Sequence, residues 1–420
     1  MKFLKTIEEK LAAAIKQGGG ELLQDLIENH TDEFFATLRR VKPILKIPGG
    51  PVFVTLFDDV QEVLSRPEVF TVKGYAPKMD PSVGPYMLAR DGTTINDRDK
   101  GIMRAMLQRE DLPRVAELSA RLARDAIRQG VQGGRLEVVA NLARKVPVQL
   151  TGEYFGFPGP DLATMMRWSR ATQYDMFHNL DNDERIHQEN VQAGREMKTY
   201  LTGLVQERRA EPERDPERDD TLSRLLKSRF PEAIGFDDER LLTNMMGLLV
   251  GGVETTSQAV VQIIDQFLDR PEQMAGLRQA AAAGDDQLVF QYCWEALRFN
   301  PINPFVARLC EADYVLASGT LRETPIEAGT LVLPSGRSAM HDERELEHPE
   351  EFRLDRPPYH YMHMGYGLHT CLGDHVGRAQ IPQIVKQLVL AGSIRRVAGA
   401  EGKIDFAGGP FPERFVVELS

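Results

Sequence analysis

Cysteine is scarce in this sequence. The 420 residues include three cysteines, Cys293, Cys310 and Cys371. An odd and widely scattered set predicts no disulfide framework, and the spacing does not suit a cysteine-based zinc site. We therefore expect a protein of the reducing cytoplasm. Any functional cysteine in it would act without a second cysteine.

Long apolar runs are also missing. The most apolar short stretch, from Met245 to Val253, is followed directly by Glu254 and is far shorter than the ~20 residues that a bilayer requires. Residues 1–30 are amphipathic and charged, without the apolar core or small-residue cleavage site of a signal peptide. We expect no membrane span and interpret residues 1–30 as an N-terminal helical extension.

The chain has no excess of basic residues. Lys and Arg number 51 and Asp and Glu number 62, which gives a formal net charge of −11. Because phosphate binding needs a large basic field, this balance argues against a nucleic-acid partner. Dinucleotide-binding glycine patterns, phosphate loops, His-Glu-x-x-His and Gly-x-Ser-x-Gly are absent too, which excludes several common enzyme classes.

Helical periodicity dominates the middle of the chain, from about Asp97 to Asn300. Length alone suggests about three domains, but no shift in composition marks a boundary. Before this region we expect a helix over 32–45, ended by Pro48–Pro51, and a loop over 77–92. Short elements are expected around them: strands over 52–56 and 69–72, a helix over 58–65, strands after Pro301, a helix over 373–390, and a β-like tail from Ile394.

One segment concentrates glycines around a cysteine. Gly365, Gly367 and Gly373 surround Cys371, and a helical pattern begins directly afterwards. Glycines permit unusual backbone angles and close approach to a flat ligand, and a helix N-terminus favours the thiolate. For a lone cysteine, the simpler interpretation would be a buried thiol in a glycine-rich turn.

The order of residues from Met364 to Gly373 resembles the heme-binding signature of the cytochrome P450 family, Phe-Gly-x-Gly-x-His/Arg-x-Cys-x-Gly. Met364 replaces the leading aromatic residue. The resemblance implies heme b (iron protoporphyrin IX) as cofactor, with Cys371 as its axial thiolate ligand. It implies that His369 pairs with a heme propionate and that Gly365 and Gly373 belong to the heme-binding loop.

Two further patterns upstream match the family. Glu295 and Arg298 form its Glu-x-x-Arg pair, 371 − 295 = 76 residues before the cysteine. At this spacing the two side chains share one helix face and can pair, and the resemblance gives them a structural role. Arg308 stands where the family has an arginine that binds a heme propionate, a task suited to a permanently charged guanidinium.

The stretch from Gly251 to Ser257 resembles the distal helix of the family, which kinks over the heme. The resemblance implies that Thr255 and Glu254 deliver protons for dioxygen cleavage, and that Val250, Gly251 and Thr255 line the substrate pocket. Isolated from the other motifs, the same stretch could be a glycine-weakened core helix. The acid–alcohol pair favours oxygen activation.

The chain departs from the family after Asp91-Gly92. A His or Trp and a following Arg hold a propionate in the family, whereas this sequence has Ile95, Asn96 and Lys100 there. We expect Lys100 to replace the arginine, with Arg98 and Arg104 as alternatives. A solvated helix face is the competing interpretation for each of them.

The resemblance runs from Val52 to the C-terminus and implies a mainly α fold with small β-sheets, a single heme domain over 31–420. It implies a monooxygenase that inserts one oxygen atom from O2 into an apolar small molecule: a fatty acid, terpenoid, steroid or polyketide. Electrons would come from a separate ferredoxin or flavodoxin with its reductase. Its expected docking patch comprises Lys100, Arg104, His375 and Arg378.

Two alternatives share the heme but not this reaction. A heme-thiolate isomerase of lipid hydroperoxides would need neither electrons nor Thr255. A non-catalytic heme sensor of gas or redox state would have no evident need of the pair Glu254-Thr255.

Overall fold

The computed structural model describes residues 25–27, 29–179, 181–210 and 217–420. The predicted N-terminal extension therefore lies largely outside the described residues. The chain forms two compact units. The β-rich unit contains the residues up to Gly74, Leu88–Gly92 and Asn303–Cys371, and the helical unit contains Tyr75–Met87, Thr93–Ile302 and Leu372–Ser420.

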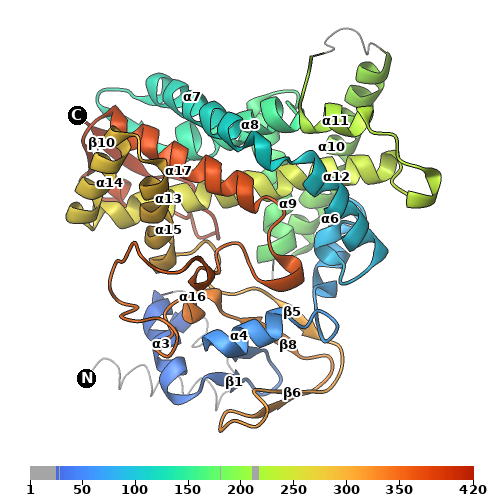
Figure 1. The fold of residues 1–420 in the computed structure, drawn as a ribbon, viewed down its shortest axis with the longest axis vertical. Helices are drawn as coiled ribbons and strands as arrows, with labels where there is room; N and C mark the ends of the chain where they lie inside the picture. Colours follow the sequence, from blue (N-terminus) through green and yellow to red (C-terminus); the bar gives the residue numbers. More distant parts are fainter. Residues whose placement is uncertain (1–24, 28, 180, 211–216) are drawn as a thin grey trace. The chain divides into compact units, whose positions relative to one another are not determined.

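A five-stranded sheet organises the β-rich unit (Figure 1). Its strand order is β1-β2-β8-β5-β3; β2 and β8 run parallel and the other neighbours antiparallel. The bounds are β1 Ile44–Lys46, β2 Val52–Val54, β3 Phe70–Thr71, β5 Arg308–Cys310 and β8 Leu331–Pro334, with a separate hairpin of β6 Tyr314–Leu316 and β7 Thr324–Ile326. Helices α3 (Thr31–Val41), α4 (Phe57–Leu64) and α16 (Gly336–Ala339) complete the unit.

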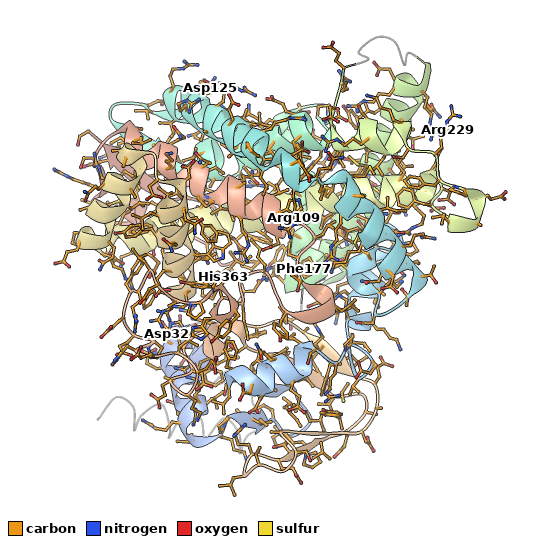
Figure 2. All side chains as sticks on the ribbon, in the orientation of Figure 1. Asp32, Arg109, Asp125, Phe177, Arg229 and His363 are labelled. Carbon is orange, nitrogen blue, oxygen red and sulfur yellow. The ribbon has the colours of Figure 1, made fainter. Side chains whose placement is uncertain are left out.

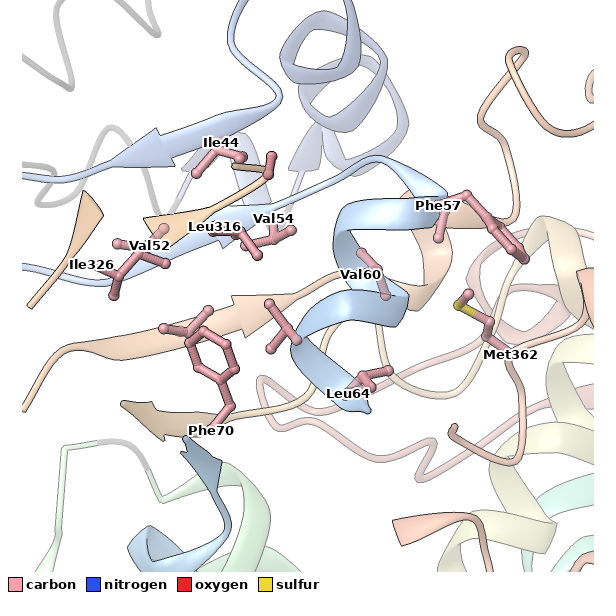
Figure 3. Close-up of a cluster of buried hydrophobic side chains, with 14 of the residues drawn as sticks. Ile44, Val52, Val54, Phe57, Val60, Leu64, Phe70, Leu316, Ile326 and Met362 are labelled. Atoms are coloured by element: carbon pink, nitrogen blue, oxygen red, sulfur yellow. The ribbon is translucent and has the colours of Figure 1, made fainter. Parts of the chain in front are cut away.

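Both faces of β2 are buried. Val52 and Val54 join the cluster that includes Phe57, Val60 and Leu64 of α4 (Figure 3). Phe53 points to the other cluster, where its ring meets Phe34 of α3 edge-on at 5.7 Å. Because successive strand residues face opposite sides, the uninterrupted apolar run Val-Phe-Val suits a strand covered on both faces.

The helix expected over 32–45 is shorter in the structure. It ends at Val41, and Ile44–Lys46 pair with β2 instead. Pro43 explains the difference, because a proline disfavours helical geometry in the residue before it and cannot continue the ladder of hydrogen bonds. The expected loop over 77–92 contains two short helical turns, α5 (Ala76–Met79) and a 3-10 turn at Met87–Ala89.

Long helices build the other unit, in which α17 packs along α7 (Figure 1). Aspartates at 161, 237 and 285 cap α9, α12 and α15 by accepting backbone N–H groups, which removes unsatisfied donors. The bounds are α6 Thr94–Met106, α7 Leu112–Gly130, α8 Lys145–Leu150, α9 Leu162–His178, α10 Glu184–Ala210, α11 Thr221–Lys227, α12 Asp238–Gly252, α13 Glu254–Leu268, α14 Pro271–Ala283, α15 Asp286–Phe299 and α17 Asp374–Ala391.

A small sheet of order β4-β10-β9 completes the helical unit. β10 (Val416–Leu419) and β9 (Ile394–Arg396) lie in the expected β-like tail, whereas β4 (Arg135–Glu137) interrupts a region expected to be helical. β4 forms by pairing with β10, far along the chain. The expectation of a mainly α fold with small sheets is confirmed. Among the described residues, no helix combines the length and the hydropathy of a membrane span.

Candidate functional site

The loop before Cys371 is closed by its own hydrogen bonds. The Cys371 N–H donates to the Met364 carbonyl at 2.8 Å. The Thr370 N–H and hydroxyl both donate to the Gly367 carbonyl, at 3.1 and 2.9 Å. The Cys371 side chain is exposed. The loop thus presents a sulfur that a metal can reach.

Two of the three glycines around Cys371 are required by the backbone. Gly365 and Gly367 have φ angles of +75° and +69°, a region that favours glycine. A Cβ at Gly367 would also lie 2.6 Å from the Leu64 carbonyl oxygen. The third glycine, Gly373, has an ordinary φ of −85° and is the N-cap residue of α17.

The other two cysteines differ from Cys371 in their surroundings. Cys293 and Cys310 are fully buried, and burial raises the pKa of both thiols. They therefore stay protonated and shielded at neutral pH. Of the three cysteines, Cys371 alone combines exposure with a loop shaped to hold it.

His369 has a carboxylate partner that the sequence did not reveal. Its Nε2 lies 2.7 Å from Oδ1 of Asp91, and the two side chains are 5% and 10% exposed. The other oxygen of Asp91 accepts the Val72 N–H at 2.9 Å. Asp91 thereby fixes the orientation of the imidazole in the β-rich unit.

Arg308 also lies in the β-rich unit. Arg308 is 7% exposed on β5, and its Nη1 donates to the Ala307 carbonyl at 2.8 Å. Arg308, His369 and Cys371 give this unit a buried guanidinium, a fixed imidazole and an exposed thiol. These groups fit a heme, because the sulfur suits iron and the two cationic or donor groups suit propionate carboxylates.

Lys100 lies on the inner face of α6 and is 7% exposed. The expectation that it contributes to an exposed docking patch is therefore wrong. Asn96, Asp99, Lys100 and Met103 are all buried, and this i, i+3, i+4, i+7 spacing defines the packed side of a helix. Of its two alternatives, Arg98 pairs with Asp99 at 2.8 Å and Arg104 is exposed.

The rest of the expected patch lies on α17. His375 Nε2 is 2.7 Å from the Leu107 carbonyl, which ties the start of α17 to the end of α6. Arg378 pairs with Asp374 at 2.7 Å and lies over the Trp294 ring at 5.4 Å.

Glu295 and Arg298 form the expected pair on α15. Nη2 of Arg298 donates to Oε1 of Glu295 at 2.8 Å and Nε donates to Oε2 at 3.0 Å, with both side chains 0% exposed. Two parallel charge-assisted bonds give this buried pair a fixed geometry.

The expected break in the distal helix is present. α12 ends at Gly252 and α13 begins at Glu254. The Thr255 hydroxyl donates to the Gly251 carbonyl at 2.6 Å, and a Cβ added at exposed Gly251 would meet nothing within 4 Å. Open space therefore borders Gly251. Val250 is only 4% exposed, and its carbonyl accepts the Gln173 amide at 2.7 Å.

Glu254 is buried between two arginines that sequence reasoning missed. Its side chain is 1% exposed. Arg144 donates to Oε1 at 2.7 and 3.1 Å, and Arg170 Nη2 lies 2.9 Å from Oε2. Two guanidinium groups therefore hold the carboxylate away from solvent.

Arg170 links this buried carboxylate to the surface. It also pairs with Glu413, whose side chain is 43% exposed, and lies over the Phe411 ring at 4.5 Å. His178, edge-on to the same ring, has its pKa lowered to about 4 by burial and by the charge of Arg170. The imidazole is therefore neutral, and the ion pairs Glu254–Arg170–Glu413 cross from interior to exterior.

Comparisons with known proteins agree with these features. The family model described as Cytochrome P450 matches residues 160–391. The chain is 26% identical over 366 residues to the mycinamicin IV hydroxylase/epoxidase of Micromonospora griseorubida, covering 85% of this chain and 86% of that protein. It is 24% identical over 357 residues to the steroid C26-monooxygenase of Mycolicibacterium smegmatis, covering 85% and 84%.

The fold comparison spans both units. The ligand-free structure of cytochrome P450 TbtJ1 matches with a TM-score of 0.77 at 21% identity, covering 93% of this chain and 98% of that one. The two units together thus correspond to one domain of that fold. The chain belongs to the cytochrome P450 family and is a heme-containing monooxygenase of the bacterial type.

Proposed function

We propose that this enzyme inserts one oxygen atom from O2 into an apolar small molecule, with heme b held by Cys371. The observation that carries the proposal is the exposed sulfur of Cys371 in its hydrogen-bonded glycine loop. When bound, the heme supplies the activation of dioxygen. Arg308 and His369 would pair with its propionates, and the bonded pair Glu295–Arg298 would stiffen α15.

We propose that Thr255 and Glu254 handle the protons of the reaction. The Thr255 hydroxyl borders the open space at Gly251 and can exchange its intrahelical acceptor for one in that space. Glu254 is the buried carboxylate beside it, and Arg170 connects it through ion pairs to the exposed Glu413. A positioned hydroxyl and carboxylate are suited to controlled proton delivery.

Replacing Thr255 with alanine or Glu254 with glutamine should separate electron use from product formation. We expect product formation to fall on the order of 100-fold, the usual contribution of a general acid or base, while reductant consumption continues. The measurement is product formed per NADPH consumed. Thr256→Ala, at a buried neighbouring hydroxyl, is the matched control, and equal losses in both variants would contradict the proposal.

The proposed substrate is apolar and of the fatty-acid, terpenoid, steroid or polyketide class. Two relatives are named for mycinamicin IV and for steroids, which supports a large and mainly apolar molecule. At the open space Gly251 has no side chain and Thr255 has a short one, and Val250 would contribute an apolar part of the wall.

The reaction itself can be tested with isotopic oxygen. Holoenzyme, a surrogate ferredoxin with its reductase, NADPH and 18O2 would be incubated with a panel drawn from the four classes. We expect one 18O atom in the product, and only when reductant is present. Turnover of a hydroperoxide without reductant would favour the isomerase, and a lack of oxygen insertion with every substrate would favour the sensor.

We propose that a separate ferredoxin or flavodoxin docks near the end of α6. Arg104 and Arg109 are exposed there, and Figure 2 labels Arg109. Neither has a hydrogen-bond or ion-pair partner among the described residues. His375 joins α17 to the same place. Such uncompensated cations attract an acidic partner despite the negative net charge.

Reversing these charges should slow electron transfer. In Arg104→Glu/Arg109→Glu we expect about a tenfold slower first reduction by an acidic ferredoxin at low salt, because electrostatic steering is lost. Stopped-flow reduction under CO measures this rate. Arg128→Glu, at an exposed position on α7, is the control, and unchanged rates in the double variant would contradict the docking site.

A further inference from the structure

We propose that a groove between α9 and α10 is a second ligand-binding site, which takes an aromatic carboxylate. The groove has a volume of about 570 Å³. Both helices belong to the helical unit and pack against each other. The site is independent of the proposed function, because it involves neither the cysteine of the heme-binding loop nor the open space beside Gly251.

The groove and the distal helix lie on opposite sides of α9. Thr164, Arg167 and Trp168 line the groove, and their spacing of three and four residues places them on one face of the helix. Gln173 follows Thr164 by about two and a half turns. Its side chain therefore projects to the other side, where its amide donates to the Val250 carbonyl of α12 at 2.7 Å.

Two aromatic side chains, Trp168 and Tyr200, form part of the groove wall. Their ring centroids are 6.1 Å apart, and both rings stack on Phe157, at 6.3 and 6.0 Å. The Tyr200 hydroxyl donates to the Gly159 carbonyl at 3.0 Å. Tyr200 is partly exposed whereas Trp168 is 2% exposed, so Tyr200 offers the larger surface to a ligand. Because packing and hydrogen bonding already hold its ring, a flat aromatic group can bind to it at little entropic cost.

Glu196 is the one acidic residue among the described residues that line the groove, and its carboxylate is fully used. One oxygen accepts Nε1 of Trp168 at 2.7 Å and pairs with Arg167, and the other accepts the Gln192 amide at 3.0 Å. The hydrogen bonds from Trp168, Arg167 and Gln192, in that order, lower the pKa of Glu196 to about 2. The carboxylate is therefore ionised at neutral pH, and Arg167 compensates its charge.

Arg195 lies in the same groove without such compensation. It is exposed, and no residue that the structure describes forms a hydrogen bond or an ion pair with its guanidinium. With Arg167 and Arg195 against Glu196, the groove carries one surplus positive charge, although the net charge of the chain is −11. A guanidinium binds a carboxylate through two parallel hydrogen bonds. The groove is therefore complementary to a carboxylate at Arg195.

Arg195 and Tyr200 mark the two edges of the α10 side of the groove. Glu196 and Thr199 lie between them. Five positions on a helix correspond to about 7.5 Å along its axis and about 140° around it. A fused two-ring carboxylic acid has a suitable length to place its far ring against Tyr200 while its carboxylate meets Arg195.

Two probes of the same shape test this site. 2-Naphthoate and its neutral amide, 2-naphthamide, would be titrated into the holoenzyme at neutral pH by isothermal calorimetry. We expect the wild type to bind 2-naphthoate about tenfold more tightly than the amide, because the guanidinium recognises the carboxylate. In Arg195→Glu this preference should disappear, and in Arg195→Lys, which keeps the charge but not the planar fork, it should be reduced.

Arg185→Glu is the matched control. Arg185 is also an exposed arginine of α10 but does not line the groove, so its replacement changes the net charge equally and should leave the preference intact. Tyr200→Leu tests the aromatic wall. It should weaken the binding of both probes about fivefold and leave their ratio unchanged, with circular dichroism used to confirm that the variant is folded.

Two results would overturn the site. If the preference for 2-naphthoate is the same in wild type and Arg195→Glu, the carboxylate binds elsewhere, for example beside the heme. If inorganic phosphate displaces 2-naphthoate at equal concentration and Tyr200→Leu has no effect, the groove attracts anions without recognising an aromatic ring.

Discussion

Replacing Cys371 with alanine is expected to abolish the strongly red-shifted Soret band of the dithionite-reduced, CO-bound protein, and oxygen insertion with it. The band depends on thiolate ligation, and the electron donation of the same sulfur favours cleavage of the O–O bond. Cys371 is exposed at the end of the glycine-rich loop and can reach an iron atom, whereas Cys293 and Cys310 are buried.

Cys293→Ala and Cys310→Ala are therefore the matched controls. Both should retain the red-shifted band, although each removes a packed side chain and will cost some stability. A wild-type band at the position of histidine-ligated heme would contradict the assignment of Cys371. So would a Cys371→Ala protein that kept the red-shifted band.

Removing one member of the buried pair Glu295–Arg298 should strongly lower the free energy of unfolding. In Arg298→Met, the carboxylate of Glu295 loses the guanidinium that holds it with bonds of 2.8 and 3.0 Å in a fully buried position. An uncompensated buried charge costs about 3–5 kcal/mol. Urea unfolding of the holoenzyme, followed by circular dichroism and heme absorbance, measures this loss.

The double variant Glu295→Leu/Arg298→Met is the informative comparison. Replacing a whole buried ion pair with apolar side chains is often close to neutral, so the double variant should be more stable than Arg298→Met. If it were less stable, the pair would have a further role, such as supporting the heme-binding loop. A single variant within about 1 kcal/mol of wild type would contradict the prediction.

Local patterns predicted those parts of the protein that depend on neighbouring residues. The spacing of Glu295 and Arg298 on one helix determines their pairing, and the glycines around Cys371 determine the shape of its loop. Pairs whose two residues come from distant segments have no such local pattern in the sequence. Asp91 lies 278 residues from His369, and Arg144 lies 110 residues from Glu254.

Polar residues on the packed face of α6 explain why Lys100 was wrongly expected in an exposed docking patch. α6 buries Asn96, Asp99 and Lys100, and their polarity made the face look solvated. In the structure Arg240 and Asn244 of α12 both donate to Asp99. A buried polar network of this kind is satisfied by tertiary contacts, which a single sequence does not display.

The division of the chain into two interleaved units limits how the enzyme can be recombined with its relatives. The polypeptide passes from one unit to the other after Gly74, Met87, Gly92, Ile302 and Cys371. No single cut separates the units, so a chimera made at one junction would combine fragments of both parents in at least one of the two cores. Exchange of a whole unit requires all five crossover points, and the last falls directly after Cys371. Libraries that place crossovers at these five positions should yield more folded heme proteins than libraries with the same number placed elsewhere.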